Sequence, residues 1–203
     1  MKQTIAVDID DVLSAENDAM REFINERYGL SLSDEDYQIE APYWGYWEHV
    51  WKVDKEEGRR RYEAYVDSGA KSRHRLIEGA EKAIRKLEKS YKLVIVTSRD
   101  DFLVDMTHRW LERNFPSMFQ QVAFVAVWSG DQKASKAAIC KAVGADYLID
   151  DNLEHCSLAA KEGITALLFG DYGWNRAKKL PANAIRVKDW QEVEAYFEHT
   201  ASR

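Results

Sequence analysis

The chain has 203 residues, which suits one domain, or one domain with an insertion, and allows a sizeable core. Apolar residues make up 45% and charged residues 32%, the balance of an ordinary globular protein. The formal net charge of -6 and the absence of a long basic run argue against a partner that is a nucleic-acid polymer.

The first predicted element is a short apolar strand, residues 5–7, that ends abruptly in Asp8. Asp10 follows two positions later, and the period of two in a strand lets both carboxylates point to the same side. Two such carboxylates repel each other unless a cation, a proton or a positive side chain lies between them. An exposed acidic turn after an edge strand is the alternative, and this short pattern alone does not decide between the two.

The same apolar run bears on the location of the protein. Asp8 interrupts it early, so we expect no signal peptide. No apolar run in the sequence approaches the length of a membrane-spanning helix. We therefore expect a soluble, cytoplasmic protein without a membrane partner.

Residues 15–75 form a predicted all-helical unit without a strand. Apolar side chains in residues 20–28 recur at helical spacing, and Gly29 is a suitable end for that helix. Asp54 opens a further helix with the pattern of a capping box. The segment between them is densely aromatic, and three tryptophans are predicted to share one helical face: Trp44, Trp47 and Trp51.

After Gly79 the pattern changes to strands that alternate with helices. Five strands are predicted in all, at residues 5–7, 92–96, 122–127, 146–149 and 164–169. The continuous apolar run of the second strand is typical of a buried parallel sheet. The alternation implies βαβ units, and hence an α/β fold with a doubly wound, Rossmann-like parallel sheet. A last helix is predicted after its cap, Asp189.

Polar residues follow three of these strands at their carboxyl ends, where open α/β sheets bind ligands. They are Asp8 with Asp10, Thr97 with Ser98, and Asp150 with Asp151. Lys136 begins the helix after the third strand, which brings it to the same edge, and Lys133 is a weaker rival. Each group alone could be a helix cap or a surface residue. Their joint placement at these strand ends favours an active site.

Three further residues are candidates for contact with a substrate. Arg99 follows the hydroxyl pair, and a solvent-facing loop arginine is the alternative. Trp44 and Trp47 could stack on a nucleobase, or they could form only a small core within the helical unit. The two cysteines lack C-x-x-C spacing, so we expect neither structural zinc nor a disulfide framework.

The order of these motifs resembles that of the haloacid dehalogenase (HAD) superfamily of phosphohydrolases. The resemblance rests on a D-x-D, a strand that ends in Thr, a Lys and a terminal acidic pair: Asp8, Asp10, Thr97, Lys136, Asp150 and Asp151. The helical insertion after the first motif looks like the cap of that superfamily. This implies a catalytic core of residues 1–14 and 76–203 and a small all-helical cap of residues 15–75. Glu78 stands where proline is common at the return to the core.

A narrower resemblance covers much of residues 93–176. The segments V-T-S-R, K-A-A-I-C-K-A-V-G-A-D-Y-L-I-D-D-N and L-L-F-G-D-Y-G-W-N-R look like the 5′(3′)-deoxyribonucleotidase, or C-type 5′-nucleotidase, group. The cap resembles that group less closely. The resemblance implies a hydrolase that acts on small phosphate monoesters, with (deoxy)nucleoside monophosphates as substrates.

The resemblance also implies roles for single residues. Asp8 would attack phosphorus and form an aspartyl-phosphate. Asp10 would protonate the leaving oxygen and then activate water, and the first of these steps needs a raised pKa. Asp8, the backbone carbonyl of Asp10 and Asp151 would hold Mg²⁺, with Asp150 in support.

The remaining members of the motifs would bind the phosphoryl group. Thr97 and Ser98 would donate hydrogen bonds to its oxygens, and Lys136 would offset charge on the nucleophile and on the transferring group. Arg99 would reach the substrate from the loop after them.

The sequence also bears on the alternatives to a nucleotidase. A phosphatase of small sugar or cofactor phosphates stays open, and so does a non-catalytic HAD-fold binding protein, although both Asp8 and Asp10 are present. A receiver domain is disfavoured because an acidic pair comes last as well as first. Rossmann and P-loop nucleotide-binding proteins are disfavoured because their glycine motifs are absent. The oligomeric state and the preferred base are left open.

Overall fold

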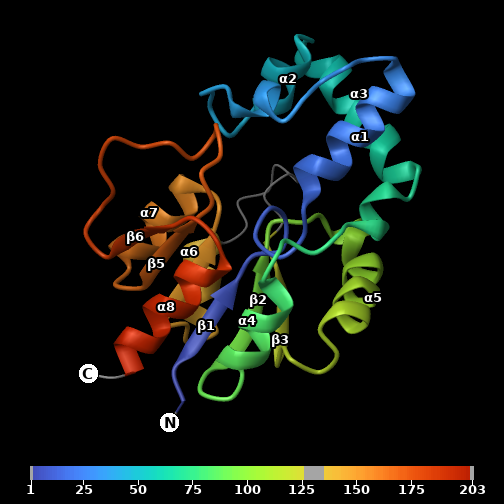
Figure 1. The fold of residues 1–203 in the computed structure, drawn as a ribbon. Coiled ribbons are helices and arrows are strands. Elements are labelled where there is room, and N and C mark those ends of the chain that lie inside the picture. Colours follow the sequence, from blue (N-terminus) through green and yellow to red (C-terminus); the bar gives the residue numbers. More distant parts are fainter. Residues whose placement is uncertain (1, 126–134, 202–203) are drawn as a thin grey trace.

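The computed structural model describes residues 2–125 and 135–201. Six parallel strands form one sheet in the order β3-β2-β1-β4-β5-β6, with helices on both faces (Figure 1). This arrangement confirms the predicted α/β, doubly wound class. None of the helices in the described ranges combines the length and the apolar character needed to cross a membrane.

The strands are β1 (Thr4–Val7), β2 (Lys92–Thr97), β3 (Gln121–Phe124), β4 (Tyr147–Asp150), β5 (Thr165–Phe169) and β6 (Ala184–Val187). The α-helices are α1 (Glu16–Tyr28), α2 (Tyr46–Trp51), α3 (Lys55–Asp67), α4 (Ala80–Leu87), α5 (Val104–Asn114), α6 (Lys136–Ala142), α7 (Leu153–Lys161) and α8 (Trp190–Ala201). Three short 3₁₀ helices, η1 (Glu35–Gln38), η2 (Ala70–Arg73) and η3 (Asp101–Leu103), complete the described elements.

The sequence predicted five of these strands and missed β6. Its four residues lie at the edge of the sheet and only Val187 is buried, so they form no continuous apolar run. The predicted third strand at residues 122–127 was too long, because β3 ends at Phe124. Residues 126 and 127 lie outside the described part of the chain.

Alternate residues of the strands face opposite layers of helices, as the pleat requires. In β1, Ile5 and Val7 pack in a cluster with α4, α5 and α8. Ala6 points the other way, into a cluster with α6 and α7. Because β1 has neighbours on both sides and helices on both faces, Asp8 leaves the sheet at its centre.

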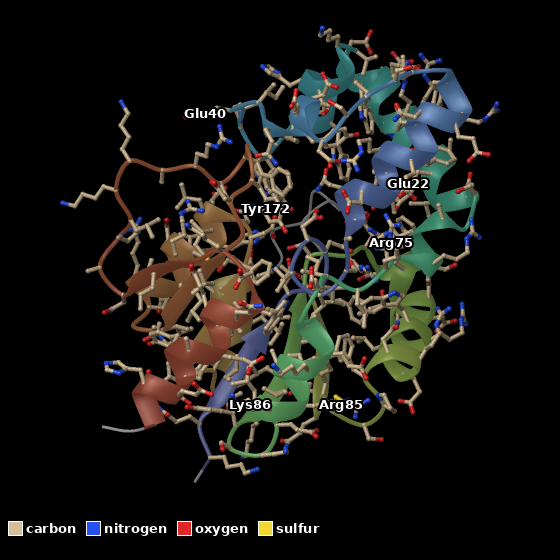
Figure 2. All side chains as sticks on the ribbon, in the orientation of Figure 1. Glu22, Glu40, Arg75, Arg85, Lys86 and Tyr172 are labelled. Carbon is tan, nitrogen blue, oxygen red and sulfur yellow. The ribbon has the colours of Figure 1, made fainter. Side chains whose placement is uncertain are left out.

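The helical region of residues 15–75, which we call the cap, stands above the carboxyl ends of the strands (Figure 1). Its two connections to the core run side by side, since the Ala15 N–H donates to the Arg75 carbonyl (3.0 Å). Arg75 also forms an exposed ion pair with Glu22 of α1 (2.7 Å; Figure 2). No strand is described between residues 15 and 75.

Local signals place the cap helices. Gly29 ends α1 in the left-handed conformation (φ 66°), and the Asp54 carboxylate accepts from the Glu57 N–H (2.8 Å) to begin α3. The sequence predicted both the end of α1 and the start of α3. The prediction that Trp44, Trp47 and Trp51 share one helical face was wrong, because α2 begins at Tyr46 and Trp44 precedes it.

Candidate active site

Asp8 and Lys136 form the centre of the site. The Asp8 backbone N–H donates to the carbonyl of Ile149 in β4 (3.0 Å), which fixes the residue beside the end of that strand. Lys136 is the first residue of α6, and the Ser135 hydroxyl caps this helix. The buried Lys136 ammonium lies 3.0 Å from Asp8 Oδ1 and 2.7 Å from Asp150 Oδ2. Lys133, the rival candidate, lies outside the described residues.

Three carboxylates meet at this point, and we call Asp8, Asp150 and Asp151 the acidic triad. Each offers one oxygen, and the three oxygens lie within 4.8 Å of one another. Burial, together with the charge of Asp150 and despite Lys136, raises the pKa of Asp8 to about 6. Burial and Asp150 also raise the pKa of Asp151 well above its ordinary value. A hard divalent cation would relieve this repulsion, and carboxylate oxygens are the ligands it prefers, so the donor set fits Mg²⁺.

The two members of the terminal acidic pair have different surroundings. Asp150 contacts Lys136 through one oxygen and accepts the Asn152 N–H through the other (2.9 Å). Burial would raise the pKa of Asp150, but Lys136 and then His155 together outweigh it and hold the pKa below its ordinary value. Asp151 accepts a hydrogen bond at Oδ2 from the Trp174 indole (2.7 Å). Both carboxylate oxygens of Asp150 are thus in contact with protein groups, whereas within the described part of the chain Oδ1 of Asp151 is left for a ligand.

The end of β2 supplies two hydroxyl groups. Thr97 is buried, and its Oγ1 accepts from the Arg99 N–H (3.3 Å). The Ser98 Oγ is buried and has no hydrogen-bond partner among the described residues. A buried hydroxyl without a protein partner is a donor available to a bound anion.

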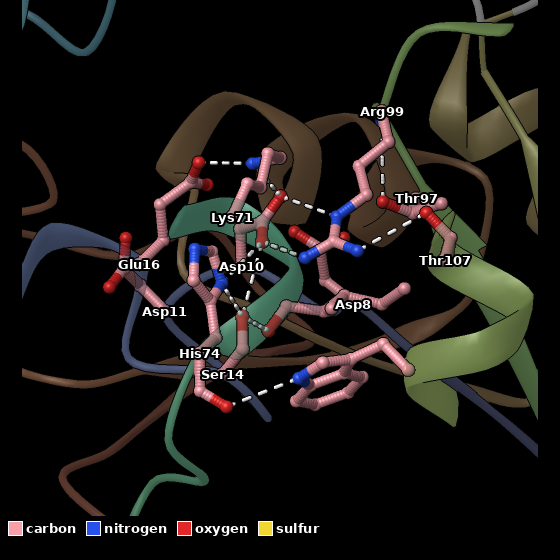
Figure 3. A network of polar contacts seen from close by, with 12 residues as sticks. Asp8, Asp10, Asp11, Ser14, Glu16, Lys71, His74, Thr97, Arg99 and Thr107 are labelled. Atoms are coloured by element: carbon pink, nitrogen blue, oxygen red, sulfur yellow. Dashed lines mark hydrogen bonds and ion pairs between the residues drawn. The ribbon is translucent and has the colours of Figure 1, made fainter. Parts of the chain in front are cut away.

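Asp10 lies between two cations (Figure 3). Arg99 binds it through two nitrogens, with Nε 2.9 Å from Oδ2, and the Lys71 ammonium lies 3.3 Å from the same oxygen. The Ser14 hydroxyl donates to Oδ1 (3.1 Å). Burial would raise the pKa of Asp10, but Arg99 and then Lys71 outweigh it and hold the pKa well below its ordinary value. The raised pKa that an acid role requires is therefore not found in this state.

Lys71 belongs to a buried polar network that the sequence did not reveal. It also forms an ion pair with Glu16, and both side chains come from the cap (Figure 3). Burial and the charge of Asp10 raise the pKa of Glu16 to about 7. Burial and Lys71 lower the pKa of His74 to about 3, and this ring contacts Tyr65 Oη and Ser14 Oγ. Lys71 lies 61 residues after Asp10 in the chain, so no local motif could signal the contact.

The two candidate tryptophans have different environments. Trp47 stacks on Trp51 and on Tyr62, with ring centroids 5.8 and 5.4 Å apart, so it contributes to the core of the cap. Trp44 is 42% exposed, and its indole N–H donates to Glu154 of α7 (3.3 Å). Trp44 therefore reaches from the cap to the edge of the catalytic core.

Tyr43 is a site residue that the sequence did not single out. Its ring lies 6.4 Å from the ring of His155, which is beside Asp150. Burial, followed by the charges of Asp151 and Asp8, raises the pKa of the Tyr43 hydroxyl well above its ordinary value. A neutral aromatic ring from the cap thus lies close to the acidic triad. Its place in the aromatic segment was the only sequence signal.

Comparison with known families gives a match over nearly the whole chain. Residues 2–201 match the family described as 5′ nucleotidase, deoxy (pyrimidine), cytosolic type C protein. YqfW of Bacillus subtilis, provisionally named a nucleotidase, is 25% identical over 195 residues, which are 93% of this chain and 90% of that protein. BH1399 of Halalkalibacterium halodurans, provisionally named likewise, is 22% identical over 127 residues. This match spans 62% of this chain and 60% of that protein, so the chain spans less than two thirds of this relative.

Solved structures share the fold at low sequence identity. The haloacid dehalogenase-like hydrolase SP0104 from Streptococcus pneumoniae superposes with a TM-score of 0.63 and 17% identity, over 97% of this chain and 98% of that one. The HAD hydrolase YfnB from Bacillus subtilis, solved with bound magnesium, gives a TM-score of 0.61 and 13% identity, over 97% and 99% of the two chains. These likenesses concern the arrangement of the sheet, the helices and the cap.

Proposed function

The chain belongs to the cytosolic type C 5′-nucleotidase family of the HAD superfamily of hydrolases, and on that premise we propose a substrate and a mechanism. The protein is proposed to be an Mg²⁺-dependent phosphatase of (deoxy)nucleoside 5′-monophosphates that works through an aspartyl-phosphate. The observation that carries this proposal is the acidic triad, held around the buried Lys136 beneath the cap. The family's description as cytosolic supports a cytoplasmic location.

Asp8 is the proposed nucleophile. It follows β1 at the centre of the sheet, and Lys136 contacts its Oδ1 at 3.0 Å, which stabilises the ionised form that attacks phosphorus. Asp8, Asp151 and the backbone carbonyl of Asp10 would hold Mg²⁺, with Asp150 in support. When bound, Mg²⁺ would neutralise part of the charge on the carboxylates and on the phosphoryl oxygens.

The transferring phosphoryl group needs donors that match its oxygens. The Ser98 hydroxyl is buried and has no partner among the described residues, and Thr97 lies next to it at the end of β2. Lys136 would offset the charge that develops between the nucleophile and phosphorus. These three residues form the proposed phosphate site.

Asp10 is the proposed acid and base. It would protonate the leaving oxygen in the first step and take a proton from water in the second. Arg99 and Lys71 hold it in a fixed orientation, because they bind both of its oxygens from two directions. An anionic substrate that reaches Asp10 would meet the same two cations, whose side chains are buried.

The cap, proposed as residues 15–75, would receive the nucleoside. Tyr43 lies close to the acidic triad, and the partly exposed Trp44 stands at the edge of the core. Stacking of a base on one aromatic ring is worth about 1–3 kcal/mol. Together with the family description, these rings support nucleotides, with deoxy and pyrimidine forms preferred, over sugar phosphates.

A phosphate-release screen tests the proposal. Nucleoside 5′-monophosphates, sugar phosphates and p-nitrophenyl phosphate are compared with Mg²⁺ and with excess chelator. We expect nucleotides to give the highest kcat/KM and chelator to abolish turnover. Preference for a sugar phosphate over every nucleotide would refute the nucleotidase but not the phosphatase.

The nucleophile is tested by Asp8→Asn, which keeps the shape of the side chain and removes its charge. We expect no measurable turnover with an unchanged far-UV circular dichroism spectrum. The matched control is Asp146→Asn, which changes an exposed carboxylate just before the amino end of β4 and should keep full activity. Undiminished activity of Asp8→Asn would refute the aspartyl-phosphate mechanism.

A further inference from the structure

The segment of residues 170–176, G-D-Y-G-W-N-R, follows β5 and has no role in the mechanism above. Its Trp174 donates its indole N–H to Oδ2 of Asp151 (2.7 Å). Both side chains are buried, with 8% and 2% of their surface exposed. A hydrogen bond to a buried carboxylate is stronger than one between neutral groups, and it fixes the orientation of the carboxylate.

The same indole is part of the core of the cap. Trp174 stacks on Tyr172 with ring centroids 4.4 Å apart and planes inclined by 6°, and it meets the edge of Tyr46 at 4.9 Å. Tyr46 begins α2 of the cap. Figure 2 shows Tyr172 between the core and the cap, where its hydroxyl donates to the Asp11 carbonyl (2.8 Å). One side chain therefore contacts a proposed metal ligand and a cap helix at once.

The backbone around Trp174 is held from the core. The Asn175 side-chain amide donates to the carbonyls of Asp151 (3.0 Å) and Phe169 (2.8 Å). Arg186 of β6 donates to the carbonyls of Gly170 (2.7 Å) and Asn175 (2.6 Å). These bonds leave the segment little freedom to move away from Asp151.

The cap touches this segment along the backbone as well. A Cβ atom placed on Gly173 would lie 2.0 Å from the carbonyl oxygen of Ile39 and 2.5 Å from the hydroxyl of Tyr46. Such a close approach admits only glycine. The cap residue Tyr46 contacts both Gly173 and Trp174, so a displacement of the cap would remove packing from the Trp174 indole.

We infer that Trp174 is a positioning residue that orients Asp151 for the divalent cation and couples cation binding to docking of the cap. The inference rests on the proposed metal site. When the cap docks on the core, Tyr46 packs against the Trp174 indole. The packed indole then orients the Asp151 carboxylate, and the oriented carboxylate favours binding of the cation. Coupling between two binding events is reciprocal, so the bound cation must also stabilise the docked cap.

The first test measures Mg²⁺ binding to the whole protein by titration calorimetry without substrate. Trp174→Phe keeps an aromatic ring and removes the donor, and residues that orient metal ligands typically contribute about 10–100-fold in affinity. We expect the Kd for Mg²⁺ to rise by about that factor. The matched control is Trp51→Phe, which removes an indole donor to Tyr37 Oη (2.8 Å) within the cap and should keep the wild-type Kd.

The second test needs no substitution. Hydrogen exchange of residues 39–51 is measured on the wild-type protein with and without Mg²⁺, and we expect Mg²⁺ to slow it. The same measurement on Trp174→Phe at saturating Mg²⁺ should show no such slowing. Exchange that is indifferent to Mg²⁺ in the wild type overturns the coupling even if Trp174→Phe fails to fold.

The outcomes separate this inference from the function on which it rests. A wild-type protein that binds no Mg²⁺ overturns the metal site and the inference together. A wild-type protein that binds Mg²⁺ and a folded Trp174→Phe variant with the same Kd overturn the inference alone. A rise in Kd shared equally by Trp51→Phe would show only general loosening of the cap and would also overturn it.

Discussion

Asp10 must give a proton to the leaving group in the proposed reaction, yet Arg99 and Lys71 stabilise its ionised form. A phosphate monoester brings negative charge of its own, and it would compete with Asp10 for these two cations. Each contact that passes from Asp10 to the substrate raises the pKa of Asp10 towards the value that an acid needs. We therefore expect substrate binding itself to prepare Asp10 for proton transfer.

The role of Asp10 is tested by Asp10→Asn, which keeps a similar shape but cannot exchange a proton in this range. We expect kcat to fall by about 10²–10⁴-fold with little change in KM, because acid–base help acts in the transition state. Steady-state kinetics on the best nucleotide give both constants. A raised KM with an unchanged kcat would make Asp10 a binding residue only.

Asp8 leads to a prediction about pH, because its raised pKa of about 6 lies near neutrality. Below pH 6 the folded protein holds a proton on Asp8, and this proton competes with the cation; above pH 6 the competition fades. We expect the Kd for Mg²⁺ to decrease at least about tenfold from pH 5 to pH 7, with proton release on binding, because the raised pKa of Asp151 adds to the effect of Asp8. Calorimetry in buffers of different ionisation enthalpy measures both quantities.

Glu16 supplies the control for this measurement, since its pKa of about 7 falls in the same range. Glu16→Gln removes that titration and should leave the pH dependence of Mg²⁺ binding in place. Equal Kd values at pH 5 and pH 7 in the wild type would argue against Asp8 as a ligand. If Glu16→Gln abolished the pH dependence of Mg²⁺ binding, the dependence would come from Glu16 and not from Asp8.

At the scale of elements, β1, β2 and β4 explain why much of the site was predictable. Parallel strands end at a common edge, so Thr97 and Asp150 could be placed near Asp8 without knowledge of side-chain packing. No comparable rule predicts the position of Lys71, near the end of the cap, because that position depends on how the cap helices pack over the core. Trp174 was present in a recognised segment, but its contact with Asp151 depends on a side-chain orientation that periodicity does not encode.

The cap tryptophans were predicted as a pair, and the structure gives them different expected phenotypes. Trp44→Ala should lower kcat/KM for nucleotides, since stacking is worth about 1–3 kcal/mol, and leave p-nitrophenyl phosphate almost unaffected. Trp47→Ala should lower turnover of both substrates alike and reduce Tm, because Trp47 stacks on Trp51 and Tyr62. Equal losses on both substrates in Trp44→Ala would show that this residue only supports the cap.

At the scale of the whole molecule, buried charge joins the cap to the catalytic core. Lys71 and Glu16 come from opposite ends of the cap, both are buried, and Lys71 also contacts Asp10 of the core. Charges inside a protein are costly unless they are paired, so these groups stabilise one relative position of cap and core. The hydrogen bond from Trp174 to Asp151 acts on the same boundary from the other side of the site.

This argument predicts strong coupling between Lys71 and Glu16 in a double-mutant cycle. Lys71→Met alone leaves the buried Glu16 carboxylate without its cation and removes one of the two cations that contact Asp10. Breaking a buried pair in this way costs about 3–5 kcal/mol of unfolding free energy. Adding Glu16→Gln removes the stranded charge of Glu16, so the double variant should be more stable than the sum of the single changes implies. Denaturant unfolding of the four proteins gives the coupling energy, which we expect to exceed about 1 kcal/mol.

An exposed pair of the same chemistry provides the comparison. Lys141 and Glu162 lie 2.8 Å apart on the surface, and their side chains are 68% and 46% exposed. Surface pairs contribute little to stability because water and salt screen them, so the cycle of Lys141→Met with Glu162→Gln should be nearly additive. If the Lys71 cycle were equally additive, the buried charges would not hold the cap, and its position would depend on apolar packing and on Trp174 instead. Because Lys71 also lowers the pKa of Asp10, activity of Lys71→Met measured against pH should then still report the loss of that cation.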